Sequence, residues 1–245
     1  MPPEPGYVKR LQDHYLTRLP MAERWSDPSF LYSWRHPIGY YQRERVRRAV
    51  IRLLNRHQVN LAASVLDVGC GTGDFLRFIA ELRGAADTLF GVDLSHESLM
   101  RGRRINAAIH IFQGDARQLP FRAESFNIVS QSVTFSHLTD PADLHAAAAE
   151  IGRVCAPDGW LIWQDLLPQS SASQQGFGLE VVRKLLPGFR VIASETLFRN
   201  IRLPWVTIST AYAVPTRSLL LADLAERILP GSANNLLVLL QKHAD

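Results

Sequence analysis

Three glycines and an acid stand close together in the segment Val65-Leu66-Asp67-Val68-Gly69-Cys70-Gly71-Thr72-Gly73. Glycine is needed where a tight strand-to-helix turn adopts a positive φ, and where a ligand lies against bare backbone. The spacing Gly69-x-Gly71-x-Gly73 differs from the dinucleotide pattern G-x-G-x-x-G. The segment is therefore typical of a loop that holds a cofactor against its backbone, and the motifs that follow must show which cofactor it is.

Acids follow two further apolar runs. Asp93 ends the run 88–92, about 20 residues beyond the glycines, where a carboxylate accepts hydrogen bonds from the two hydroxyls of a ribose. Asp115 comes after the run 109–114. Each of these two acids, taken by itself, is more often a helix cap or a loop acid than a cofactor ligand, and Ser95 is a candidate cap of the next helix. Asp67 by itself is equally well a turn residue.

Five motifs in order over residues 60–165 resemble those of the class I S-adenosylmethionine-dependent methyltransferases. They are the glycine segment, the two runs ending in acids, the run 126–131, and the Pro-x-Gly turn with its flanks at 153–162. The resemblance implies S-adenosyl-L-methionine as cofactor and S-adenosyl-L-homocysteine as product. It places Asp93 on the ribose, Asp115 on the adenine amino group, and the backbone amide of Ala116 on the adenine ring. The expected cofactor-binding residues are Asp67, Gly69, Cys70, Gly71, Gly73, Asp93, Leu94, Asp115, Ala116 and Gln131.

The elements that must position these residues alternate between strand-like and helix-like runs from about residue 60 onward, which predicts an α/β fold. Helices are expected over 74–83, 141–154 and 179–186, and strands over 189–197 and 234–241. By the resemblance, the sheet is Rossmann-like and doubly wound, with seven strands in the order 3-2-1-4-5-7-6 and strand 7 antiparallel.

We expect a single domain. Its parts are an N-terminal helical cap (1–58), a cofactor-binding core (60–165) and a substrate-side part (166–245). An insertion is expected between strands 6 and 7 over 200–230, with a helix at 218–229.

Open α/β sheets bind ligands beyond the carboxyl ends of their strands. His137 follows the fourth expected strand and is a candidate general base, because a neutral imidazole can deprotonate a hydroxyl. Asp165 ends the fifth and is a candidate to bind or deprotonate a substrate hydroxyl. The alternatives are a cap or packing histidine and a turn acid. Phe135 is expected to line the acceptor site, and no cluster of acids gathers there, so we expect a reaction without a metal.

The greatest overall similarity is to small-molecule methyltransferases of the methyltransferase domain 11 type, and loop residues at 130–141 and 163–165 resemble bacterial enzymes of polysaccharide or secondary metabolism. The first hypothesis is O-methylation of a hydroxyl on a metabolite or sugar. The second is C-methylation of a quinone or isoprenoid diphosphate precursor, and the third is a non-catalytic cofactor-binding scaffold protein. The Asn/Asp-Pro-Pro-Tyr/Phe motif of nucleobase methyltransferases does not follow the fourth strand, and no RNA-binding module is appended, so a nucleic-acid acceptor is not expected.

The net charge of +4 is unevenly distributed, with eleven basic and five acidic side chains in residues 1–56. Six arginines between 43 and 56 lie on an amphipathic helix. Three explanations suit this arginine-rich face: a solvated helix surface, attraction of an anionic substrate, or contact with nucleic acid or a membrane surface.

Five aromatic residues crowd into positions 30–41. They suit either the packing of a first helix or a lid whose rings contact the sulfonium. Tyr32, Tyr40 and Tyr41 are the candidate substrate-binding residues in this segment.

The chain has no uncharged apolar stretch of about 18 residues and no apolar signal-peptide core. Its two cysteines, Cys70 and Cys155, form neither a metal-binding nor a disulfide pattern. We therefore expect a cytoplasmic protein.

Overall fold

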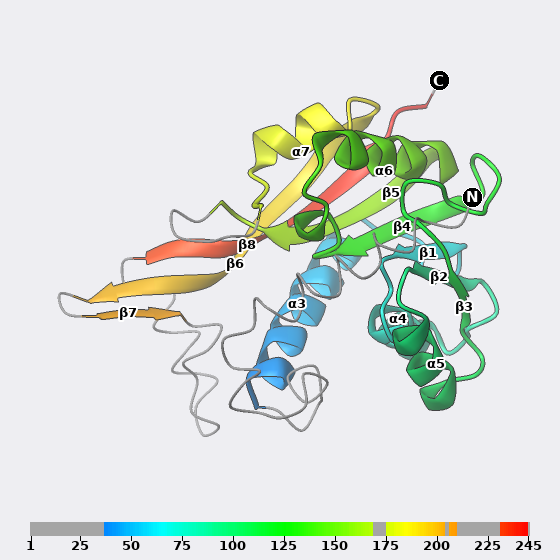
Figure 1. Cartoon of the computed structure of the whole chain (residues 1–245), viewed down its shortest axis with the longest axis horizontal. Helices are drawn as coiled ribbons and strands as arrows, with labels where there is room; N and C mark the ends of the chain where they lie inside the picture. Colours follow the sequence, from blue (N-terminus) through cyan, green and yellow to red (C-terminus); the bar gives the residue numbers. More distant parts are fainter. Residues whose placement is uncertain (1–36, 169–174, 204–205, 210–230, 245) are drawn as a thin grey trace.

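An eight-stranded sheet forms the centre of the molecule, in the order β3-β2-β1-β4-β5-β8-β6-β7 (Figure 1). The computed structural model describes residues 37–168, 175–203, 206–209 and 231–244. Strands β1 to β5 pair in parallel, whereas β8 runs antiparallel to both β5 and β6. The strands are β1 (Val65–Val68), β2 (Leu89–Asp93), β3 (His110–Gln113), β4 (Phe126–Ser132), β5 (Cys155–Leu166), β6 (Phe189–Leu203), β7 (Val206–Ser209) and β8 (Gly231–Lys242).

Helices cover both faces of this sheet. On one face lie α6 (Pro141–Val154) and α7 (Leu179–Leu185), and on the other lie α3 (Pro37–Arg56), α4 (Asp74–Arg83) and α5 (His96–Ile105) (Figure 1). Each face has its own cluster of buried apolar side chains. All four residues of β1 are buried, because a central parallel strand is covered on both sides. The Rossmann-like, doubly wound architecture predicted from the sequence is confirmed.

The ends of the helices follow from local signals in the sequence. Asp140 caps α6 by accepting a hydrogen bond from the amide of Ala142 at 2.8 Å, and Pro141 occupies its first turn. Ser95 caps α5 by accepting from Ser98 at 3.2 Å, as the sequence suggested. Gly84 ends α4 in the left-handed conformation.

The observed sheet contains the seven expected strands and one more. The predicted order 3-2-1-4-5-7-6 is present, with β8 as the seventh strand, but β6 continues to Leu203 and a short strand β7 is added at its edge. The long β6 pairs with β8 as far as Gly231, so each strand satisfies the backbone of the other past the end of β5. The helix expected at 218–229 lies outside the described residues.

The tyrosines expected to bind substrate also fall at or beyond the limits of the described residues. Tyr32 lies outside the described residues, and Tyr40 and Tyr41 lie on the backbone of α3 with side chains that are not described. Within the described parts of the chain, no helix is both long and apolar enough to cross a membrane.

Candidate functional site

The carboxyl ends of four parallel strands meet at one edge of the sheet. Val68 of β1 pairs with Val92 of β2 and with Gln131 of β4, and Asp93 pairs with Gln113 of β3. The register therefore places the glycine loop between the acid that ends β2 and the polar end of β4. Ligands bind at this edge in open α/β sheets.

The three glycines of the loop all have positive φ, with values of 73° at Gly69, 54° at Gly71 and 76° at Gly73. A Cβ built on Gly71 would meet nothing within 4 Å, so this part of the backbone faces open space. Such a space is what a cofactor lying against bare backbone requires. The loop of this structure therefore fits the predicted S-adenosylmethionine site.

Asp93 lies beneath the loop. Its carboxylate accepts hydrogen bonds from the amide of Gly71 at 2.8 Å and from the amide of Ser95 at 2.7 Å. Burial raises the pKa of Asp93, and these two hydrogen bonds oppose that rise. An ionised carboxylate has about four acceptor sites, so two remain for the hydroxyls of a ribose.

Asp67 is buried at the end of β1, with 4% of its surface exposed. The hydroxyl of Ser130 donates to its carboxylate at 2.7 Å. Burial raises the pKa of Asp67 to about 7, the Ser130 hydrogen bond lowers it, and the nearby charge of Asp93 raises it further. The carboxyl of Asp67 therefore changes its charge near neutral pH.

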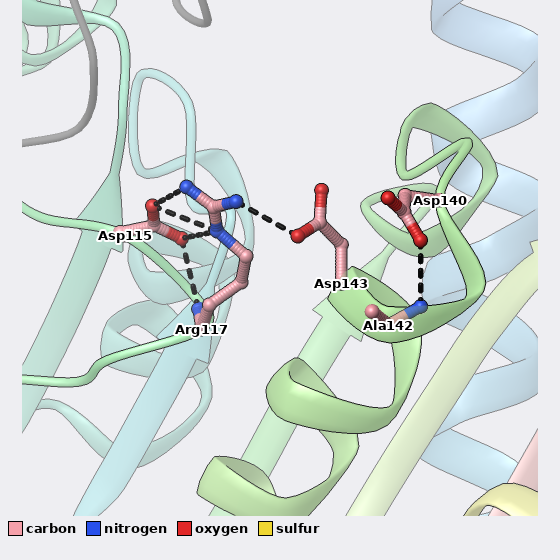
Figure 2. A network of polar contacts seen from close by, with 5 residues as sticks. All are labelled: Asp115, Arg117, Asp140, Ala142 and Asp143. Atoms are coloured by element: carbon pink, nitrogen blue, oxygen red, sulfur yellow. Dashed lines mark hydrogen bonds and ion pairs between the residues drawn. The ribbon is translucent and has the colours of Figure 1, made fainter.

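Asp115 is held by an arginine that the sequence analysis did not single out. Arg117 donates through its backbone amide and its guanidinium to Asp115, and the same guanidinium donates to Asp143 at the start of α6 (Figure 2). The spacing Asp-x-Arg is a local signal that could have indicated the first contact. No local signal indicates the second, because Asp143 lies 26 positions away.

The remaining cofactor candidates surround these acids. Gln131 is 1% exposed, and its side chain accepts from the amide of Thr134 at 3.1 Å and donates to the carbonyl of Gln164 at 3.2 Å. The carbonyl of Leu94 accepts from Gln113 at 3.2 Å, and Ala116 packs against the core. Burial raises the pKa of the Cys70 thiol well above its ordinary value, which disfavours the thiolate that a nucleophile needs.

The acceptor side is built from β5 and the segment after β4. Asp165 is fully buried and accepts from the amide of Leu166 at 2.8 Å. Burial raises the pKa of Asp165 to about 6, and the amide of Leu166 together with the nearby polar groups of Ser136 and Gln131 opposes the rise. His137 directly follows Ser136, at the end of the short 3₁₀ helix η1 (Phe135–His137), and is partly exposed.

Phe135 does not line an open site. Its ring has no exposed surface and lies 4.4 Å from the ring of Trp163 and 6.3 Å from that of Phe177, measured between centroids. Aromatic rings contribute most to stability when they are buried and pack against each other, and here three rings pack on one face of the sheet. Phe135 is therefore a core residue, which corrects the expected contact with substrate.

The arginines of α3 are partly engaged in ion pairs. Arg47 lies 3.4 Å from Asp74, directly after the glycine loop, and Arg77 also contacts Asp74 at 3.3 Å. Arg52 pairs with Glu195 of β6 at 2.7 Å. The expected exposed arginine face therefore holds α3 against α4 and β6 as well as facing solvent. Within the described residues, no group of three His, Cys, Asp or Glu side chains is placed to hold a metal ion.

Comparison with known proteins agrees with this geometry. A protein-family model described as a methyltransferase domain matches residues 65–159. The chain is 30% identical over 145 residues to a demethylmenaquinone methyltransferase from Lactobacillus johnsonii, an alignment that covers 56% of this chain and 57% of that protein. It is 34% identical over 143 residues to a dTDP-3-amino-3,6-dideoxy-alpha-D-glucopyranose N,N-dimethyltransferase from Streptomyces fradiae, covering 58% of this chain and 54% of that one.

The chain thus spans little more than half the length of these relatives. A solved S-adenosylmethionine-dependent methyltransferase from Mesorhizobium loti has the same fold, with a TM-score of 0.54 at 17% identity over 74% of this chain and 91% of that one. The residues that the family model matches include the glycine loop, Asp93 and Asp115. Residues 65–159 are thus similar to a methyltransferase domain, and the chain has the fold of an S-adenosylmethionine-dependent methyltransferase.

Proposed function

We propose that this chain transfers the methyl group of S-adenosylmethionine to a hydroxyl of a small metabolite or sugar. The observation that carries the proposal is a polar cluster directly beside the glycine loop, made of Asp165, Gln131, Ser136 and the adjacent His137. Thr134 joins this cluster to the loop, because its hydroxyl donates to the carbonyl of Val68 at 3.0 Å. An oxygen acceptor must lose a proton when it is methylated, and this cluster contains groups that can take one.

The cofactor supplies a methyl group activated by its sulfonium charge. The residues of this chain bind and orient it: Gly71 provides the open backbone, Asp93 the ribose contact and Asp115 the contact with the adenine amino group. Orientation of the acceptor for in-line attack and exclusion of water are the main tasks left to the protein.

We assign the two proton-handling candidates different roles on the basis of their exposure. His137 is partly exposed, so an acceptor can reach it, and it takes the proton from the hydroxyl. Asp165 is fully buried and contacts Ser136, the residue before His137. We infer that Asp165 orients the polar cluster as a fixed negative charge, since its carboxyl is ionised above a pKa of about 6.

The test begins with calorimetric titration of the protein with S-adenosylmethionine and S-adenosylhomocysteine, followed by a screen of hydroxylated acceptors with methyl-labelled cofactor. His137→Ala should lower turnover by about 100-fold, the usual contribution of a general base, with little change in cofactor affinity. His145→Ala is the matched control, because His145 lies exposed on α6. Equal turnover in the His137 variant and the wild type would show that His137 is not the base.

A quinone carbon is the second candidate acceptor, because one relative is a demethylmenaquinone methyltransferase. The exposed arginines of α3, Arg48 and Arg56, would suit an anionic acceptor of either type. Transfer of label to a quinone instead of to any hydroxyl compound would favour this alternative. Tight binding of the cofactor without transfer to either class would favour a scaffold role.

A further inference from the structure

Arg117 joins the turn after β3 to the start of α6, and no step of the proposed reaction uses it (Figure 2). Its Nη2 donates to Asp115 at 2.6 Å and its Nη1 donates to Asp143 at 2.8 Å. The side chain of Arg117 is 27% exposed, that of Asp115 11% and that of Asp143 18%. Charges that are mostly shielded from water interact more strongly than pairs on an open surface.

The hydrogen bonds of this arginine nearly fill the carboxylate of Asp115. Oδ1 accepts from the backbone amide of Arg117 at 2.9 Å and from its Nε at 3.0 Å. Oδ2 accepts from the same Nε at 3.0 Å and from Nη2. Three N–H groups therefore point at a carboxylate that has about four acceptor sites. Nε divides one hydrogen between the two oxygens, so three donor hydrogens are bound and about one acceptor site remains for a further donor.

The main chain of the same turn is also fixed by a hydrogen bond. The carbonyl of Asp115 accepts from the amide of Gln118 at 3.0 Å. Asp143 lies in the first turn of α6, which Asp140 caps, so the far end of the arginine is attached to a well-anchored helix. Both the backbone and the side chain of Asp115 are thus held in one orientation.

We propose that Arg117 is a positioning residue that makes Asp115 selective for a purine with an amino group, and that Asp143 holds Arg117 in place. The inference rests on the proposed function, in which Asp115 accepts a hydrogen bond from the adenine amino group. An amino purine offers the single donor that the remaining acceptor site needs. A purine with an oxygen at that position brings an acceptor against an acceptor, and the arginine prevents the carboxylate from turning away to relieve the repulsion.

A purely structural role for Arg117 makes a different prediction. If the arginine only attached the turn to α6, its removal would lower stability and weaken the binding of every purine ligand by the same factor. Selectivity between two ligands that differ only at the amino position is the quantity that separates the two roles.

The test is calorimetric measurement of the dissociation constants of S-adenosylhomocysteine and S-inosylhomocysteine, in which an oxygen replaces the adenine amino group. Wild type should prefer S-adenosylhomocysteine. Arg117→Met keeps the apolar stem but removes the guanidinium, and should reduce that preference about tenfold, the effect of one hydrogen bond to a charged group. Arg117→Lys should restore only part of it, because an ammonium cannot form the two-pronged contact.

Two further variants complete the design. Asp143→Asn should reduce the preference less than Arg117→Met, because Asp115 still holds the arginine. Arg183→Ala is the matched control: Arg183 pairs with Glu180 at 2.6 Å on α7 and is 50% exposed. Its removal should leave the preference unchanged, and thermal melting of each variant identifies any that fails to fold.

An unchanged preference in Arg117→Met, or an equal loss of affinity for both ligands, would overturn the proposal. So would a wild type that binds S-adenosylhomocysteine without preferring it to S-inosylhomocysteine. Normal binding and preference without methyl transfer to any hydroxyl compound would count against the proposed reaction alone. Absence of binding to either ligand would overturn both.

Discussion

Thr134 lies against Gly69 so closely that a Cβ on residue 69 would collide with both its hydroxyl and its methyl group. The hydroxyl of Thr134 also donates to the carbonyl of Val68 at 3.0 Å. This contact joins the cofactor loop after β1 to the acceptor-side segment after β4. The two glycines Gly69 and Gly71 therefore serve different purposes: the first admits another part of the protein, and the second leaves space for a ligand.

Alanine substitution should separate these two purposes. Gly69→Ala combines the collision with a φ of 73°, and should lower the free energy of unfolding by about 3 kcal/mol. Gly71→Ala meets no neighbour within 4 Å and should cost only about 1 kcal/mol of backbone strain. It should nevertheless weaken S-adenosylhomocysteine binding by more than tenfold, because its Cβ enters the space for the ligand. Chemical denaturation and calorimetry measure the two effects, and equal stability losses would contradict the distinction.

Asp93 should couple the ribose contact to the shape of the loop. Asp93→Ala removes the acceptor of the Gly71 and Ser95 amides, and should weaken cofactor binding by about 100-fold. Asp93→Asn keeps one carbonyl oxygen and should fall between this variant and the wild type. Calorimetric titration with S-adenosylhomocysteine measures both, and an unchanged dissociation constant in Asp93→Ala would refute the ribose assignment.

The buried carboxyl of Asp67 should make stability depend on pH. Its pKa is raised from 3.8 to about 7, mainly by burial, so between about pH 4 and pH 7 the folded protein holds a proton that the unfolded chain has released. The free energy of unfolding should therefore fall as pH rises through this range. Asp67→Asn does not titrate and should remove about 4 kcal/mol of this fall.

The control for this prediction is Asp87→Asn, since the side chain of Asp87 is 81% exposed. Urea denaturation at several pH values measures the slopes. Because Asp93 and Asp165 also have raised pKa values, only the difference between wild type and Asp67→Asn is assigned to Asp67. Parallel curves for those two proteins would contradict it.

Val133 is a strained residue between the two halves of the site. It has a φ of 58°, which β-branched residues very rarely adopt. Its amide donates to the carbonyl of Gln164 at 2.8 Å and its own carbonyl accepts from Ser136 at 3.1 Å, so two elements hold it in this conformation. Val133→Gly should raise the free energy of unfolding by about 1 kcal/mol, after the entropy cost of glycine is subtracted.

The same substitution should lower turnover, because a freer backbone at residue 133 positions Thr134 and Ser136 less firmly. Urea denaturation and the labelled transfer assay measure the two quantities on one preparation. A variant that is less stable than the wild type would show that no strain is stored at this position.

Local patterns in the sequence determined the cofactor side of this protein and the core of its fold. The glycine loop and the caps at Ser95 and Asp140 depend on contacts within a few residues of the chain, and the predicted bounds of α4 and α6 were confirmed. The order of seven strands, which the family resemblance implied, is also present in the sheet.

Only the tertiary structure decided the contacts between distant segments. Arg117 meets Asp143 across 26 positions, Thr134 lies against Gly69, and Phe135 packs with Trp163 and Phe177. The periodicity of apolar and charged residues indicates which face of an element is buried, but it does not indicate which side chains from other elements pack against that face. The neighbour of each side chain depends on how the two layers of helices pack against the sheet. For this reason Phe135, expected to line the acceptor site, lies in the core, and Arg117 is a partner of Asp115.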